Sequence, residues 1–182
     1  MRLERAGESI ALIDQALTRF TPTPNDLLYP ALFSLLGFAW VLCGAPSKGV
    51  ELIRRSIDAA EALGLMVRRS QQATWLAEGL MASGRTAEAE NVAREAVARA
   101  VACHEHGHQA WALRTLARTL QRRDPPVAAQ IERTASALAV RHGLLTLLRK
   151  HAGKADPLTD GPGAGDVVAY PEGGRSGRVS RA

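Results

Sequence analysis

Aromatic residues are scarce in this sequence, at 4% of its 182 residues, and β-branched residues are few as well. Both kinds of side chain are enriched in β-strands, so their scarcity argues against a fold built on sheets. Alanine and leucine dominate instead, and both are strong helix formers. The hydrophobic share of 46% is enough to bury one core or a series of small cores. The composition therefore predicts an all-α protein.

Cysteine is almost absent, since the chain contains only Cys43 and Cys103, which lie 60 positions apart. This pair forms neither a disulfide framework nor a C-x-x-C metal motif. The first residues, MRLERAGESIALIDQ, carry charges where a secretory signal peptide would need an apolar core. We therefore expect the chain to work in the reducing cytoplasm.

Charged residues are missing from residues 27–47, LLYPALFSLLGFAWVLCGAPS, over about the length of a membrane span. However, Pro30, Gly37, Gly44 and Pro46 interrupt this run, and its far end resembles a turn. We expect a buried helix and no membrane contact. A membrane-anchored helical protein is the alternative.

The chain as a whole is basic, with a formal net charge of +5 that comes mainly from arginine. A basic balance alone is a weak indication of acidic partners. Binding of single-stranded nucleic acid would need aromatic residues among the basic ones, or a known binding module, and the sequence has neither. We therefore expect no contact with nucleic acid.

A spacing of forty residues recurs along the chain, beginning with Leu-Gly or Leu-Ala pairs at 36–37, 76–77 and 116–117. Each pair is followed by a large apolar residue, a turn or cap residue and two small residues. The large apolar residues are Trp40, Leu80 and Leu120, and the turn or cap residues are Gly44, Gly84 and Asp124. The first small residues are Gly49, Ala89 and Ala129, and the second are Ser56, Ala96 and Ser136. This order predicts a helix hairpin in each unit, with small residues where two backbones approach. Stacked hairpins share a core that one hairpin cannot form alone.

The same register extends towards the N-terminus and predicts an additional helix without a preceding partner. Its matching positions are Ser9, Ile13, Ala16, Leu17 and Phe20. This orphan helix is either the remainder of a longer solenoid or a genuine cap. From about Gly153 the sequence turns rich in glycine and proline and loses all periodicity. We expect a helical repeat domain over residues 1–150, with about three and a half hairpins, and a disordered tail over residues 151–182.

The repeated pattern resembles the tetratricopeptide repeat, which places Leu-Gly or Leu-Ala on its first helix and small residues on its second. The middle unit matches best, at Leu76, Ala77, Leu80, Gly84, Ala89, Ala93 and Ala96. The first unit departs from the family at Gly49 and Ser56, and the third at Asp124, Arg133 and Ser136. The period of forty is also longer than that of the family. The resemblance implies an αα-hairpin superhelix.

Two stretches, SGRTAEAENVAREAVARA and HGHQAWALRTLARTLQRRDPPVAAQ, are similar to the C-terminal helical repeats of large bacterial ATP-binding regulators. These are the LuxR-type transcriptional activators and adenylate-cyclase-associated regulators. The sequence contains no G-x-x-x-x-G-K-[ST] phosphate loop, no cyclase-like segment and no DNA-reading helix-turn-helix after the repeats. The resemblance covers roughly residues 4–148 and implies a regulator's repeat region without its catalytic or DNA-binding parts.

The stretch CHEHGH at residues 103–108 spells H-E-x-x-H through His104, Glu105 and His108. On one intact helix this spacing places two imidazoles on the same face, as in zinc metalloproteases. The repeat register instead places the stretch across a helix C-terminus and the following loop, with Gly107 as the C-cap. We therefore expect no metal and no catalysis here. A metal-dependent hydrolase using this stretch remains the alternative.

The resemblance further implies that the first helices of the hairpins line a concave groove that binds a peptide. The groove positions are Trp111, Arg114, Arg118, Gln121 and Arg122 in the third unit, Glu78 in the second and Phe38 in the first. Arg114, Arg118 and Arg122 are spaced i, i+4, i+8, which predicts a basic stripe on one helix. Arginine pairs with carboxylates in a bidentate manner, so the groove suits a peptide with one acidic and one apolar end.

The sequence thus predicts a non-catalytic protein–protein interaction scaffold that needs no cofactor. Its expected setting is the C-terminal repeat part of a bacterial signalling or transcriptional regulator. The expected partner is a protein or peptide, acidic in part, or domains upstream in a longer polypeptide.

Overall fold

The computed structural model describes residues 8, 10–12, 15, 23 and 26–144. All regular structure in this part of the chain is helical, which confirms the prediction of an all-α protein. The helices of the main body are α2 (Tyr29–Leu42), α3 (Pro46–Ala62), α4 (Arg69–Ala82), α5 (Thr86–Ala102), α6 (His106–Leu120) and α7 (Pro125–Arg141). The predicted positions of the orphan helix and the predicted tail over 151–182 lie outside the described residues.

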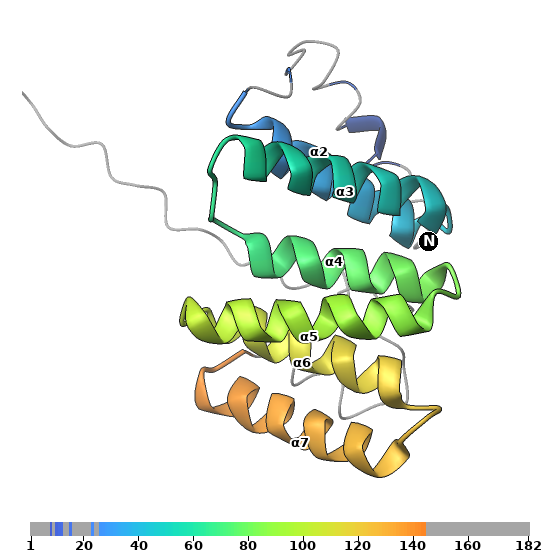
Figure 1. Ribbon diagram of the computed structural model, residues 1–182, viewed down its shortest axis with the longest axis vertical. Helices are drawn as coiled ribbons and strands as arrows, with labels where there is room; N and C mark the ends of the chain where they lie inside the picture. The colour runs from blue at the N-terminus through green and yellow to red at the C-terminus, as the bar shows by residue number, and fades with distance from the viewer. Residues whose placement is uncertain (1–7, 9, 13–14, 16–22, 24–25, 145–182) are drawn as a thin grey trace, which may run out of the picture.

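The helices form three hairpins, in which α2 pairs with α3, α4 with α5, and α6 with α7 (Figure 1). The hairpins are stacked in chain order along the long axis of the molecule. Helix α4 also packs against α3 of the preceding hairpin, as α6 packs against α5. The first helices contact each other directly, α2 on α4 and α4 on α6. Each hairpin therefore shares its apolar surface with its neighbour.

The turns of the first two hairpins are built around glycine, as the forty-residue spacing predicts. Gly44 and Gly84 have positive φ angles of 83° and 77°, a conformation that glycine adopts without a steric penalty. The next residue in each turn closes it, since the Ala45 N–H donates to the Trp40 carbonyl at 3.0 Å. The pair Arg85 and Leu80 repeats this bond at 2.9 Å. These bonds satisfy carbonyl groups that a helix end leaves without partners.

The turn of the third hairpin is different, because no glycine follows α6. Asp124 instead caps the next helix, its side chain accepting a hydrogen bond from the Val127 N–H at 3.2 Å. Pro125 forms the first position of α7, where its fixed φ angle suits a helix and its missing N–H costs nothing. This confirms the prediction of a turn or cap residue at position 124.

Helices within a hairpin approach closely where the sequence has small residues. A methyl group added to Gly37 would lie 2.7 Å from the Ile53 Cγ1 atom and 2.8 Å from the Gly49 carbonyl oxygen. Both distances are shorter than ordinary van der Waals contacts. The glycines at positions 37 and 49 thus allow α2 and α3 to pack backbone against backbone.

The register predicted for the third unit is wrong by one residue. Ala129 is exposed, and Ala128 is buried in its place. Ala135 likewise takes the buried position that was expected for Ser136. The cause is that α7 begins 39 residues after α5 rather than 40, because the turn without glycine follows a different path.

The uncharged run at residues 27–47 forms α2 and the first turn of α3, in agreement with the expectation of a buried helix. Leu36 and Ala39 of α2 pack against Ile10, one of the few described residues that precede the hairpins. Among the described residues, no helix combines the length and apolar character needed to cross a membrane.

Candidate functional site

The residues predicted to line a groove are distributed over three helices and one turn. Phe38 lies on α2 and stacks against Trp75 of α4, with ring centroids 4.9 Å apart and planes inclined by 8°. Both rings belong to the apolar cluster that joins the first two hairpins. Phe38 therefore contributes to the junction between α2 and α4.

Glu78 and Trp111, predicted independently for two different units, are brought together by the stacking of α4 on α6. The Glu78 side chain is only 3% exposed, and its Oε1 accepts a hydrogen bond of 2.9 Å from the Trp111 indole N–H. The Thr115 hydroxyl donates to the same oxygen at 3.1 Å. A buried carboxylate is costly unless such donors surround it. These three residues form a polar connection between the second and third hairpins.

Sequence reasoning missed Thr115, and the only available signal was its position one helical turn after Trp111. It also missed the role of Glu132, which lies on α7 and forms an ion pair with Arg114 at 3.3 Å between Oε1 and Nε. The Arg114 side chain is only 12% exposed. Arg114 thus holds α6 and α7 together rather than projecting freely from the surface.

The predicted stripe of three arginines on one helix is wrong for its last member. Helix α6 ends at Leu120, so Arg122 lies in the turn before α7, next to Gln121, which caps α6. Residues 121–123 form the turn that leads to Asp124, the cap of α7, and the proline at 125 disfavours a helical conformation of Asp124. Arg118 is the stripe member that remains on α6 together with Arg114. Arg122 and Gln121 are both exposed.

The CHEHGH stretch spans the end of α5, a short connection and the start of α6, as predicted. His104 lies in the connection and His108 lies on α6, so the two imidazoles do not share a helix face. The predicted role of Gly107 as C-cap is wrong. His104 itself has the positive φ angle, 55°, while Gly107 lies in the first turn of α6.

The loop histidines and the carboxylate between them have other contacts. Glu105 accepts a hydrogen bond from the hydroxyl of Ser70, a residue at the start of α4. His106 stacks on His142 from the end of α7, with ring centroids 4.2 Å apart. In the part of the chain described, no group of three or more His, Cys, Asp or Glu side chains is placed to hold a metal ion.

Glu90 and His142 are two of the titratable groups whose pKa values the fold shifts. Burial of the Glu90 carboxyl on α5 would by itself raise its pKa. The Nη2 atoms of Arg94 and Arg123 each donate a hydrogen bond to Glu90 Oε1 at 2.9 Å. These bonds outweigh the effect of burial and lower the pKa below its usual value. The pKa of His142 is lowered by desolvation, and additionally by the charges of His106 and Arg141. Glu90 also ties α5 to the turn between α6 and α7, because Arg123 lies in that turn.

Comparison of the chain with protein-family models, with curated proteins and with solved structures finds no match.

Proposed function

We propose that this chain is a non-catalytic protein-interaction module, built as a tetratricopeptide-like superhelix of about three and a half αα-hairpins. The observation that carries the proposal is the direct contact of the first helices, α2 on α4 and α4 on α6. Helices packed in this way line one side of the stack, and stacked-hairpin proteins use such a side to bind their partners.

The chemistry of this surface supports a partner that is acidic at one end. Trp111, Arg118 and Arg122 lie on or next to α6, whereas α2 contains no charged residue at all. Arginine and tryptophan are the residue types that most often dominate binding energy at protein interfaces. A segment with carboxylates towards α6 and apolar side chains towards α2 would match both ends. The proposed setting is the cytoplasmic repeat region of a bacterial regulator, and the partner is a separate protein or peptide, or another domain of the same polypeptide.

Binding of short fluorescein-labelled peptides, measured by fluorescence anisotropy, tests this proposal. The peptides share an apolar half and differ in whether the other half contains Asp and Glu or Asn and Gln. We expect the acidic peptides to bind more tightly, and the difference to shrink as added salt screens the charges. Arg118→Glu combined with Arg122→Glu should remove the preference.

The matched control places the same charge change on helices outside this surface. Arg55 on α3 and Arg133 on α7 are both exposed, so Arg55→Glu combined with Arg133→Glu changes the net charge equally. Equal loss of binding in the two double variants would show that only the overall charge matters. That result, or equal affinity for acidic and amide peptides, would contradict the proposed surface.

A further inference from the structure

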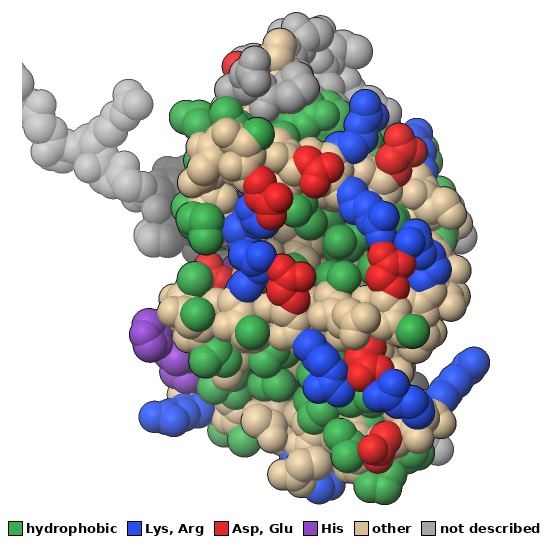
Figure 2. Space-filling view, viewed as in Figure 1, with side chains coloured by type: hydrophobic (Ala, Val, Ile, Leu, Met, Phe, Trp, Pro, Cys, Tyr) green, Lys and Arg blue, Asp and Glu red, His purple; other side chains and the backbone are tan. Residues whose placement is uncertain are grey.

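A cleft opens between α3 and α5, with α4 as its floor, and has a volume of about 270 Å³. Its apolar lining comes from Ala73 and Leu76 on the floor and from Ile57 and Val92 on the two sides. In Figure 1, α3 and α5 lie in front of α2 and α6, so this cleft is on the other side from the α6 end of the proposed peptide surface. Figure 2 shows this face, with apolar atoms between α3 and α5 bordered by charged side chains.

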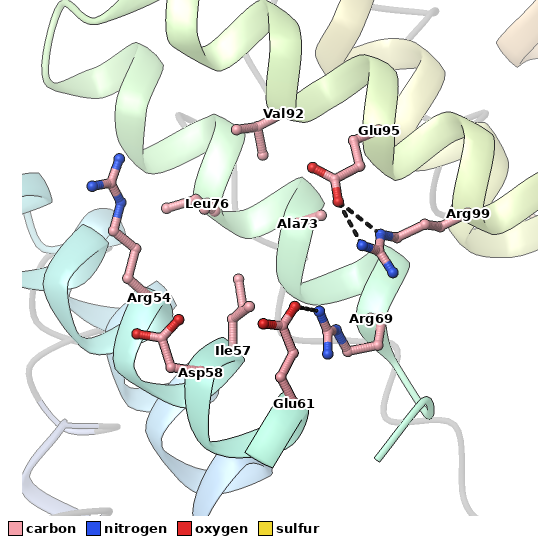
Figure 3. A pocket seen from close by; sticks show the side chains of 10 residues that line it. All are labelled: Arg54, Ile57, Asp58, Glu61, Arg69, Ala73, Leu76, Val92, Glu95 and Arg99. Carbon is pink, nitrogen blue, oxygen red and sulfur yellow. Dashed lines mark hydrogen bonds and ion pairs between the residues drawn. The ribbon is translucent and has the colours of Figure 1, made fainter. Parts of the chain in front are cut away.

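The floor of the cleft has a small residue at a position where the repeat elsewhere has a large one. Ala73 stands on α4 where the sequence has Phe33 forty residues earlier and Leu113 forty residues later. The Ala73 side chain lies at the floor of the cleft (Figure 3). A leucine at this position would fill part of the space that the alanine leaves open. The repeat thus alternates between a large and a small residue at this point.

The rim of the cleft carries three arginines and three carboxylates, so its formal charge is zero. These residues are Arg54, Arg69 and Arg99, and Asp58, Glu61 and Glu95. The corresponding positions at the junction of the second and third hairpins lie forty residues later, or thirty-nine on α7. Only one of them is charged, Arg94. The others are Ala98, Val101, Gln109, Thr134 and Leu138. The charges are therefore a feature of this cleft and not of the repeat.

The charged groups are arranged so that both signs face the same space. Arg69 is buried and pairs with Glu61, and Arg99 pairs with Glu95 (Figure 3). The figure shows the two guanidinium groups at one end of the cleft, between the two glutamates. The pair formed by Arg99 is a partly exposed i,i+4 pair on α5, which contributes little to stability and can rearrange. Among the described residues, Asp58 has no hydrogen-bond or ion-pair partner.

We propose that this cleft binds a free α-amino acid with an apolar side chain. A net-neutral rim that presents both signs favours a ligand that is itself a zwitterion. Its carboxylate would accept from Arg99 and Arg69, and its ammonium group would donate to Asp58 or Glu61. Its side chain would cover Ala73 and Leu76. The volume is slightly below the range of about 300–1,000 Å³ that larger ligands occupy, which suits a ligand of this size.

L-leucine is the probe, and binding to the full 182-residue chain is followed by calorimetry and by amide chemical shifts. We expect saturable binding, with the largest shifts at Ala73, Leu76 and Val92. Leucinamide lacks the carboxylate and N-acetyl-leucine lacks the ammonium group, so each should bind about tenfold or more weakly, the loss expected for one charged hydrogen bond. Absence of binding up to the solubility limit of leucine, or equal binding of all three compounds, would overturn the proposal.

Two variants link binding to the cleft itself. Ala73→Leu introduces the residue found at position 113 and should abolish binding. Arg99→Gln removes a surface charge with little effect on folding and should weaken the binding of free leucine about tenfold. This second variant tests the proposal even if the Ala73→Leu variant does not fold. Arg133→Gln on α7 is the control and should bind as the unchanged chain does. If an amphipathic helical peptide of Leu, Glu and Lys binds at the cleft while free leucine does not, the cleft is a protein-docking surface and the proposal is wrong.

Discussion

Replacing His104 by glycine should stabilise the protein, although the substitution removes a whole side chain. His104 has a φ angle of 55°, whereas the residues in the corresponding conformation after the ends of other helices, Gly44, Gly64, Gly84 and Gly143, are all glycines. The bond that closes this turn, from the Glu105 N–H to the Ala100 carbonyl at 2.9 Å, uses only backbone atoms and would remain. The His104 side chain is exposed, so little packing is lost.

The magnitude follows from two opposing terms. A residue with a Cβ atom in the left-handed conformation costs about 1–2 kcal/mol, which glycine avoids. Glycine in turn loses about 0.5–1 kcal/mol because its unfolded chain is more flexible. The expected net gain for His104→Gly is about 0.5–1 kcal/mol, or a rise in melting temperature of about 1–4 °C for a chain of this size. Urea denaturation followed by circular dichroism measures it as a shift of the midpoint at constant slope.

Two alanine substitutions at glycines are the matched controls. Gly64→Ala should destabilise the protein by about 1 kcal/mol, since Gly64 has a φ angle of 67°. Gly107→Ala should leave stability unchanged or raise it by up to about 1 kcal/mol, because Gly107 lies in the first turn of α6 and alanine is the better helix former. A methyl group there would approach only Leu144, at 3.9 Å. A loss of stability in Gly107→Ala, with no gain in His104→Gly, would refute the assignment of the cap to His104.

Three further substitutions test the interior and its charges by the same denaturation assay. Glu90→Gln should cost about 1–2 kcal/mol at neutral pH, and the cost should vanish well below pH 4.5, because a carboxylate with a lowered pKa stabilises the fold only while it is ionised. His142 has a lowered pKa, so the unfolded chain takes up a proton more readily and stability should fall as the pH drops below 6.5; His142→Gln should flatten this slope. Gly37→Ala should cost about 1–3 kcal/mol through the clash with Ile53 and Gly49. If the Gly37→Ala variant were as stable as the unchanged chain, the close approach of α2 and α3 at this point would not contribute to stability.

The parts of the fold that the sequence predicts correctly are those with two independent signals. Gly44 and Gly84 occur at the expected spacing, and each also follows an apolar helical pattern. The burial of the leucines at positions 36, 76 and 116 has the same double support from spacing and residue type. Where only the spacing was available, as in the third unit, the prediction missed the one-residue shift of α7. Spacing alone does not detect a turn of different length.

The groove residues show a different limit of sequence reasoning. Their helices were predicted correctly, apart from Gln121 and Arg122, which lie beyond the end of α6, but their partners were not. Glu78 was expected on a binding surface, yet its carboxylate is buried because Trp111 and Thr115 of the neighbouring hairpin donate to it. Such partners lie more than thirty positions away, and their identity depends on how one hairpin is rotated against the next. No local pattern in the sequence reports this rotation.

The two junctions between hairpins use different chemistry at equivalent places. The first is joined by the stacked rings of Phe38 and Trp75, the second by the hydrogen bonds of Glu78 to Trp111 and Thr115. Phe38 and Glu78 occupy the same repeat position. A role assigned to that position in one unit therefore does not transfer to the next. The matching positions also differ on the other side of the stack. Ala73 leaves a hollow there, and a leucine, as at position 113, would make that hollow smaller. In a chain of this kind, the deviations from the repeat, rather than the repeat itself, are the places to look for specific binding.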